Sequence, residues 1–155
     1  MSLKIEDVMI EEVVSVPEKA AVRKAAELMN KHEIGCLVVV KKRKPVGIVT
    51  ETDMVRKVIL GSIDPKETNV GEIMSQPLVV GNPEMDVDEA ARIMRTRKIK
   101  KLPVVKKGRL VGLITTTDMV RSPEVMRMMI RTIERNILKE VVRFIEKKLE
   151  PDDSR

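Results

Sequence analysis

The chain has 155 residues, of which 43% are hydrophobic and 35% are charged, a composition typical of a folded globular protein and not of a disordered chain. No stretch approaches the roughly 18 uninterrupted apolar residues of a membrane span, and the charged start leaves no apolar run for a secretory signal, so we expect a cytoplasmic protein without a membrane partner. The net charge is +6. Six basic residues fall within ten positions, and this cluster indicates that an anion binds nearby: Arg92, Arg95, Arg97, Lys98, Lys100 and Lys101.

Single cysteine and histidine residues limit the metal and redox chemistry of the chain. Cys36 is the only cysteine and His32 the only histidine, so an internal disulfide and a Cys/His zinc site are both excluded within one chain. The sequence also lacks a nucleophile and base arrangement and a Walker-type phosphate loop. We therefore expect no metal, no catalytic cofactor and no enzyme activity, and we predict that Cys36 is a buried thiol.

The chain contains an internal repeat with a shift of 65 positions. Residues 22–56 align without a gap with residues 87–121, and 18 of these 35 positions are identical. Upstream, Asp7-Val8-Met9 mirrors Glu72-Ile73-Met74, so we expect each repeat to include its own lead-in segment. The predicted domains are residues 1–64, residues 65–121 and a C-terminal helical extension of residues 122–155.

Within each repeat, the hydrophobic pattern predicts the order strand, helix, strand, strand, helix. In the first repeat, a short strand near residues 14–16 precedes a helix whose apolar face follows the spacing i, i+3, i+4, i+7 at Val22, Ala25, Ala26 and Met29. The β-branched runs 37–40 and 46–49 predict two buried strands joined by a charged hairpin. A second helix over residues 52–60 and a linker at 61–68 complete the repeat.

The first helices of the two repeats differ in their predicted caps. Asp86 precedes the helix of the second repeat and is followed by acids in the first turn, so we expect it to be the N-cap. The equivalent residue in the first repeat is Ala21, which has no capping side chain. The two halves are therefore expected to be unequal.

A long helix is predicted after the second repeat. Ser122 and Pro123 are typical of a helix start. An apolar stripe then runs over residues 124–149, a length of about 40 Å if helical. This helix either packs on its own module or pairs with a copy in another chain, and the breadth of the stripe favours the second arrangement.

Each repeat also carries a Thr-x-x-Asp turn between its last strand and its second helix. The turns contain Thr50 with Asp53, and Thr115 with Asp118. Alone, this pattern is typical of a helix cap, in which hydroxyl and carboxylate satisfy free backbone amides. The same groups also suit a ligand, because a carboxylate accepts two hydrogen bonds from a cis-diol and a helix start attracts phosphate.

The full pattern around these turns resembles a known family. Ile34-Gly35-Cys36-Leu37-Val38-Val39 followed by residues 46–56, and Leu102-Pro103-Val104-Val105 through Arg121, resemble the signature of tandem cystathionine-β-synthase-type (CBS) domains, the Bateman module. The resemblance covers residues 1 to 121. It implies an α+β (α/β-like) fold of two βαββα repeats packed as a pseudo-two-fold pair, with the long C-terminal helix added. It further implies a homodimeric regulatory sensor that binds AMP, ADP, ATP or an S-adenosylmethionine-type ligand in the cleft between the repeats.

The resemblance also implies which residues contact that ligand. It assigns the ribose to Asp53 and Asp118, with Thr50 and Thr115 beside them. The implied adenine environment is Val16, Pro17, Ile34, Gly35, Cys36, Val80, Pro83, Ile99, Lys100 and Lys101. The implied phosphate contacts are Arg56, Arg97, Lys100, Lys101 and Arg121. We expect at least one of the two sites to be occupied.

Two other functions remain open from the residues alone. The basic cluster over residues 92–101 favours a nucleic-acid-binding module, although residues 1–121 contain no aromatic side chain for base stacking. The third alternative is a ligand-free dimerisation scaffold. An unidentified regulated protein is the expected partner of a sensor.

Overall fold

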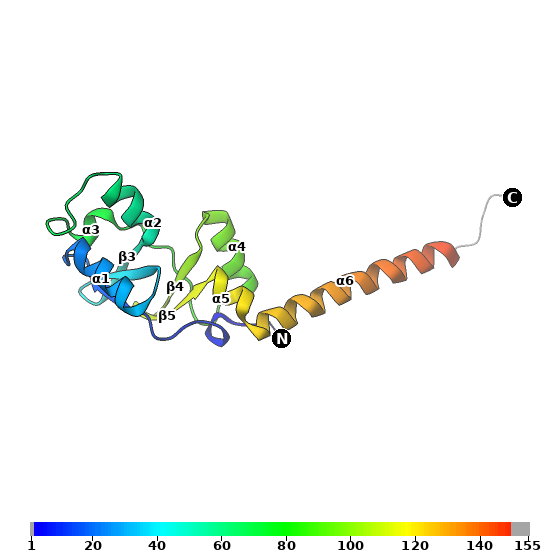
Figure 1. The fold of residues 1–155 in the computed structure, drawn as a ribbon. Helices are drawn as coiled ribbons and strands as arrows, with labels where there is room; N and C mark the ends of the chain where they lie inside the picture. The colour runs from blue at the N-terminus through cyan, green and yellow to red at the C-terminus, as the bar shows by residue number, and fades with distance from the viewer. Residues whose placement is uncertain (1, 150–155) are drawn as a thin grey trace.

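The computed structural model describes residues 2–149, which form two mixed α/β lobes and one long helix (Figure 1). The elements in chain order are η1 (Ile5–Asp7), β1 (Ser15–Pro17), α1 (Val22–His32), β2 (Cys36–Lys41), β3 (Lys44–Thr50), α2 (Glu51–Asp53), η2 (Met54–Ile59), α3 (Val70–Ile73), α4 (Val87–Arg97), β4 (Lys101–Lys106), β5 (Arg109–Thr115), α5 (Thr116–Arg121) and α6 (Pro123–Leu149). The predicted α+β class, the two repeats and the long C-terminal helix are confirmed.

The two repeats differ in the sheet that each one builds. In the first repeat, β1 pairs with β2 in parallel, and β2 pairs with β3 in an antiparallel hairpin. In the second repeat, β4 and β5 form the same hairpin, but only a single bridge from Gly81 to Val104 stands in place of β1. One cause is Pro103, because the Val38 amide at the equivalent position donates to the Val14 carbonyl at 3.3 Å and proline has no such amide.

The starts of the first helices are held by backbone carbonyls from distant segments. At α1, the Val22 amide donates to the Thr68 carbonyl at 2.8 Å. At α4, the Val87 amide donates to the Leu3 carbonyl at 2.9 Å. Asp86 stands at the N-cap position of α4, as predicted, but its side chain makes no cap hydrogen bond. It pairs instead with Lys4 Nζ at 2.9 Å, which draws the carboxylate away from the helix amides.

The lead-in segments are exchanged between the two cores. Ile5 is fully buried in the core of the second repeat, together with Val87 and Ala90 of α4. Val70 and Ile73 are buried in the core of the first repeat. Backbone bridges from Ile10 to Leu113 and from Ile48 to Ser75 accompany this exchange. Each repeat therefore completes its core with the segment that precedes the other repeat, which ties the two halves together.

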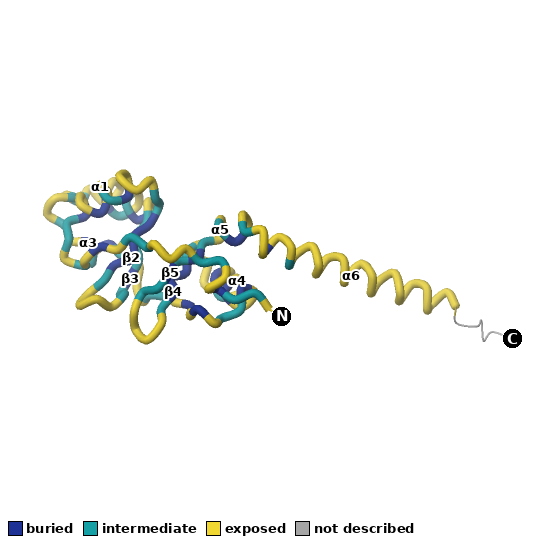
Figure 2. The backbone as a smooth tube through the Cα atoms, turned by 90° about the horizontal axis from the view of Figure 1, so that it is seen from below, coloured by how far each residue is buried: buried dark blue, intermediate teal, exposed yellow. Residues whose placement is uncertain are grey.

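Helix α6 extends away from the two lobes and is exposed along its length (Figure 2). Its 27 residues include one buried residue, Val125. Its exposed large apolar side chains are Met126, Met129, Ile130, Ile133, Ile137, Leu138, Val141, Val142, Phe144, Ile145 and Leu149. Beyond its start, α6 therefore does not pack on its own module. Within residues 2–149, no helix is long and apolar enough to cross a membrane.

Candidate functional site

The turn of the first repeat is a reciprocal helix cap. Thr50 is the N-cap of α2, and the Asp53 amide donates to Thr50 Oγ1 at 3.3 Å. In return, the Thr50 amide and hydroxyl donate to Asp53 Oδ2 at 2.9 and 3.1 Å. The capping interpretation of this turn is thus confirmed. Asp53 is only 7% exposed. Burying a carboxylate is costly unless hydrogen bonds and an opposite charge compensate for the lost hydration.

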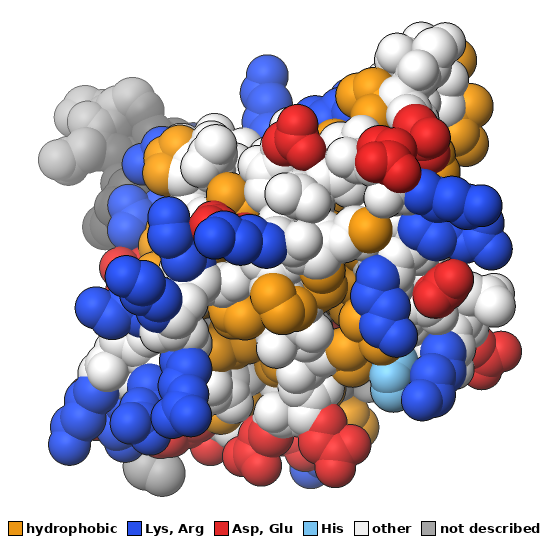
Figure 3. All heavy atoms as spheres, turned by 90° about the vertical axis from the view of Figure 1, so that its left-hand side faces the viewer, with side chains coloured by type: hydrophobic (Ala, Val, Ile, Leu, Met, Phe, Trp, Pro, Cys, Tyr) orange, Lys and Arg blue, Asp and Glu red, His pale blue; other side chains and the backbone are white. Residues whose placement is uncertain are grey.

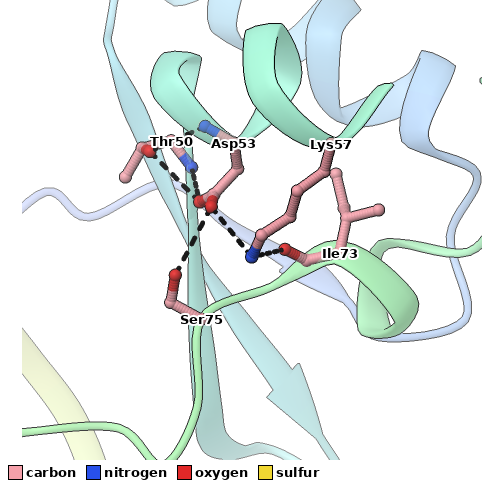
Figure 4. A network of polar contacts seen from close by, with 5 residues as sticks. All are labelled: Thr50, Asp53, Lys57, Ile73 and Ser75. Carbon is pink, nitrogen blue, oxygen red and sulfur yellow. Dashed lines mark hydrogen bonds and ion pairs between the residues drawn. The ribbon is translucent and has the colours of Figure 1, made fainter. Parts of the chain in front are cut away.

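Two further side chains contact Asp53, and sequence reasoning missed both (Figure 4). Lys57 Nζ lies 3.0 Å from Asp53 Oδ1 and also donates to the Ile73 carbonyl at 2.7 Å. Ser75 Oγ donates to the same carboxylate oxygen at 3.4 Å. The spacing of Lys57 four residues after Asp53 is a signal for such a pair on a helix. No local sequence pattern indicates that Ser75 contacts Asp53, because Ser75 belongs to the lead-in segment of the second repeat.

The turn of the second repeat has the cap but different surroundings. The Asp118 amide donates to Thr115 Oγ1 at 3.0 Å, and the Thr115 hydroxyl donates to Asp118 Oδ2. Asp118 is half-buried rather than buried. At the repeat shift of 65, Lys57 corresponds to Ser122 and Ser75 corresponds to Ile10. The ammonium and hydroxyl that contact Asp53 therefore have no counterpart at these positions.

The turn of the first repeat contacts the lead-in segment of the second. Ser75 lines a cavity of about 70 Å³ between the repeats, whose other lining residues are Ile48, Pro77, Leu78, Val79, Ile99, Lys101 and Pro103. On the other side, burial raises the pKa of the Cys36 thiol, Lys101 opposes the shift, and Asp118 and Glu51 add to it. A carboxylate of the second repeat thus contributes to the raised pKa of a thiol in the first repeat.

The predicted adenine residues occupy varied environments. Ile99 and Lys101 line the small cavity between the repeats. Val16 is 1% exposed and packs in the core of the first repeat. The remaining predicted residues range from buried Cys36 and Pro83, through half-buried Ile34 and Gly35, to exposed Pro17, Val80 and Lys100. The burial of Cys36 confirms the prediction of a buried thiol.

The predicted phosphate contacts are mostly on the surface. Lys101 is half-buried, and the exposed members are Arg56, Arg97, Lys100 and Arg121. Arg97 and Arg92 line a shallow groove of about 360 Å³ beside Val79 and Ile93. On the face of the molecule that Figure 3 presents, basic side chains lie around the edge with acidic side chains between them, and do not form one continuous basic band. Among residues 2–149, no group of three His, Cys, Asp or Glu side chains is placed to hold a metal ion.

Comparison with known proteins decides the family of this paired arrangement. The model of the CBS domain matches the chain twice, at residues 5–60 and 70–125. The chain belongs to the CBS domain family. Its tandem CBS domains form the kind of pair that serves as a regulatory module.

Relatives of this CBS domain pair extend the comparison. An uncharacterized protein of Methanopyrus kandleri is 37% identical over 79% of this chain, and the match spans 62% of that protein. A hexameric CBS-CP12 protein from bloom-forming cyanobacteria has a TM-score of 0.74 and 31% identity, covering 97% of this chain and 90% of its own. A CBS domain pair in complex with 5′-methylthioadenosine and S-adenosyl-L-methionine has a TM-score of 0.71 and 25% identity, covering 78% of this chain and 95% of its own.

Proposed function

We propose that this CBS domain pair is a regulatory sensor that binds an adenosine-containing ligand in the crevice between its two repeats. The observation that carries the proposal is the pair of acid-bearing turns at helix starts, Thr50 with Asp53 and Thr115 with Asp118. A half-exposed carboxylate beside a helix start offers acceptors for a ribose diol and a positive dipole end for an anionic group. A related pair binds two adenosine compounds, which supports the same ligand class here.

The composite construction of the site suggests how a ligand would act on the protein. A ligand that contacts a turn of one repeat and a strand start of the other favours the arrangement in which both contacts form. Such a ligand shifts the population of arrangements without any chemical reaction. A protein partner then recognises the surface of the favoured arrangement. This mechanism requires differential affinity for the two arrangements and no catalytic group.

A thermal unfolding panel tests this proposal. AMP, ADP, ATP and S-adenosylmethionine are each added to the full chain, and a binding compound raises the unfolding temperature. At a ligand concentration of 100 times Kd, the expected stabilisation is about 2.7 kcal/mol. The double variant Asp53→Ala/Asp118→Ala should lose this gain. A matched control, Glu67→Ala/Asp88→Ala, removes two exposed acids and should keep it.

The panel also separates the alternatives. A protein that responds to no adenosine compound contradicts the sensor proposal. Tight, salt-dependent binding to duplex or single-stranded nucleic acid, with no response to nucleotides, supports a nucleic-acid-binding module instead. If the protein responds neither to adenosine compounds nor to nucleic acid, the result supports the ligand-free dimerisation scaffold.

We also propose that the chain self-associates through α6. The exposed apolar side chains of this helix lie along nearly its whole length, from Met126 to Leu149, and burying them is favourable. A second copy of the same helix offers a matching apolar surface. The hexameric relative covers 97% of this chain, which is consistent with assembly of the whole unit rather than of the two CBS domains alone.

A further inference from the structure

The carboxylate of Asp53 already has a full set of hydrogen-bond partners (Figure 4). Its Oδ2 accepts from the amide and the hydroxyl of Thr50. Its Oδ1 accepts from Ser75 Oγ at 3.4 Å and lies 3.0 Å from Lys57 Nζ. A carboxylate has about four acceptor positions on its two oxygens. No position is left for the hydroxyls of a ligand unless an internal partner is displaced.

The partners of Asp53 are themselves fixed in place. Lys57 Nζ donates to the carbonyl of Ile73 at 2.7 Å, and Ile73 is only 2% exposed in the core of the first repeat. Ser75 belongs to the same lead-in segment, and its backbone pairs with Ile48 in both directions at 3.2 and 2.8 Å. Asp53 and Lys57 therefore bind the lead-in segment of the second repeat to the first repeat. A ligand that displaced Lys57 or Ser75 from Asp53 would break this contact between the repeats.

Asp118 has no such set of partners. Its Oδ2 accepts from the Thr115 hydroxyl, and within residues 2–149 its Oδ1 accepts no hydrogen bond. The equivalent of Lys57 is Ser122, whose hydroxyl is occupied at the start of α6 by Glu124 and the Val125 amide. The equivalent of Ser75 is Ile10, which has no hydroxyl. The difference between the half-sites is thus encoded at two sequence positions.

We infer that the chain binds one adenosine ligand rather than two, at the half-site of Asp118, and that Asp53 is a structural residue that joins the two repeats. This inference rests on the proposed function for its ligand and on the Lys57–Asp53–Ser75 contacts for its asymmetry. It predicts two different consequences of the same substitution at equivalent positions. Asp118→Asn removes ligand binding, whereas Asp53→Asn weakens the fold.

Calorimetric titration of the full chain with AMP, ATP and S-adenosylmethionine tests the ligand part. The expected stoichiometry is close to one ligand per chain for each compound that binds. Asp118→Asn should weaken binding by about tenfold or more, through loss of a charge-assisted acceptor. Asp53→Asn should leave the stoichiometry at one. A stoichiometry of two, or loss of binding in Asp53→Asn alone, overturns the inference.

Unfolding without ligand tests the structural part. Asp53→Asn should lower the unfolding temperature by about 3–8 °C, and Asp118→Asn by about 2 °C or less. Ser75→Ala is a milder variant that should lower it by about 2–4 °C and keeps the test valid if Asp53→Asn fails to fold. Equal shifts for the two Asp variants contradict the structural role. If none of the three compounds binds, the proposed function and the ligand part fail together, and these unfolding temperatures still decide the role of Asp53.

Discussion

The backbone of Gly112 approaches Met9 so closely that a Cβ atom on Gly112 would lie 2.5 Å from Met9 Sδ. The same Cβ would lie 3.1 Å from the Ile10 carbonyl oxygen. Gly47 in the first repeat stands in the same relation to Met74, again at 2.5 Å. The two lead-in segments thus cross the last strand of the opposite repeat at a glycine, and the absence of a side chain there allows the exchange of segments.

We expect Gly112→Ala to destabilise the protein by about 1–3 kcal/mol, because the new methyl group must displace both a side chain and a backbone carbonyl. Gly47→Ala should cost a similar amount. Gly35→Ala is the control, since its Cβ would meet only the flexible end of Glu51 at 3.3 Å. Urea unfolding measures the three free energies. A loss for Gly35→Ala as large as for Gly112→Ala would contradict the close approach.

A second prediction concerns the hairpin turn between β2 and β3. Arg43 has a φ of 64° there, and the equivalent residue between β4 and β5 is Gly108, with a φ of 75°. Left-handed backbone is costly for a residue with a Cβ atom. We expect Arg43→Gly to stabilise the protein by up to about 1 kcal/mol, and Gly108→Arg to destabilise it by about 1 kcal/mol. Thermal unfolding of both variants checks the two signs, and changes of the same sign would refute the argument.

A third prediction concerns the reactivity and the proton of Cys36. Burial, together with Asp118 and Glu51, raises the pKa of its thiol above the ordinary 9.0. The native protein therefore holds less thiolate at pH 8.5 than the unfolded chain. Alkylation by iodoacetamide should be at least about tenfold slower in native protein than in denaturant. Equal rates in the two conditions would show that the thiol is accessible.

The same shift makes stability depend on pH. Well below pH 9.0 the thiol holds its proton in both the native and the unfolded state, and the contribution of Cys36 to the free energy of unfolding is complete. Above it, the unfolded thiol loses its proton while the native thiol keeps it, so the free energy of unfolding falls as pH rises. The fall should be smaller in Cys36→Ala than in the parent. Urea unfolding at pH 8 and pH 10 measures the difference, and identical slopes would contradict it.

A fourth prediction concerns α6. If this helix joins copies of the chain, Ile133→Glu/Ile137→Glu should convert an oligomer to a monomer, because charge at a buried apolar contact is costly. Thr132→Glu introduces the same carboxylate on an exposed position of the same helix and should leave the assembly intact. Sedimentation velocity reports the molar mass of each. A parent chain that is monomeric at every concentration would exclude this interface.

Much of the fold followed from local patterns. The strand runs, the helix with Val22 and Met29 on one face, and the long C-terminal helix depend on periodicity within a short window, which the sequence displays directly. The caps at Thr50 and Thr115 were predictable for the same reason, since both partners lie three residues apart. The N-cap position of Asp86 was predictable too, but the missing side-chain cap hydrogen bond was not, because its competing partner Lys4 is 82 residues away.

By itself, the sequence determined that the chain is a repeat, where each acid-bearing turn lies, and to which family its pattern is similar. Only the tertiary structure decided that each lead-in segment completes the opposite core, and that Asp53 is enclosed by Lys57 and Ser75 while Asp118 is not. The physical reason is one of distance along the chain. Hydrogen bonds within a turn are set by neighbouring residues, whereas the contact of Ser75 with Asp53 spans 22 positions and forms only when the two repeats pack together.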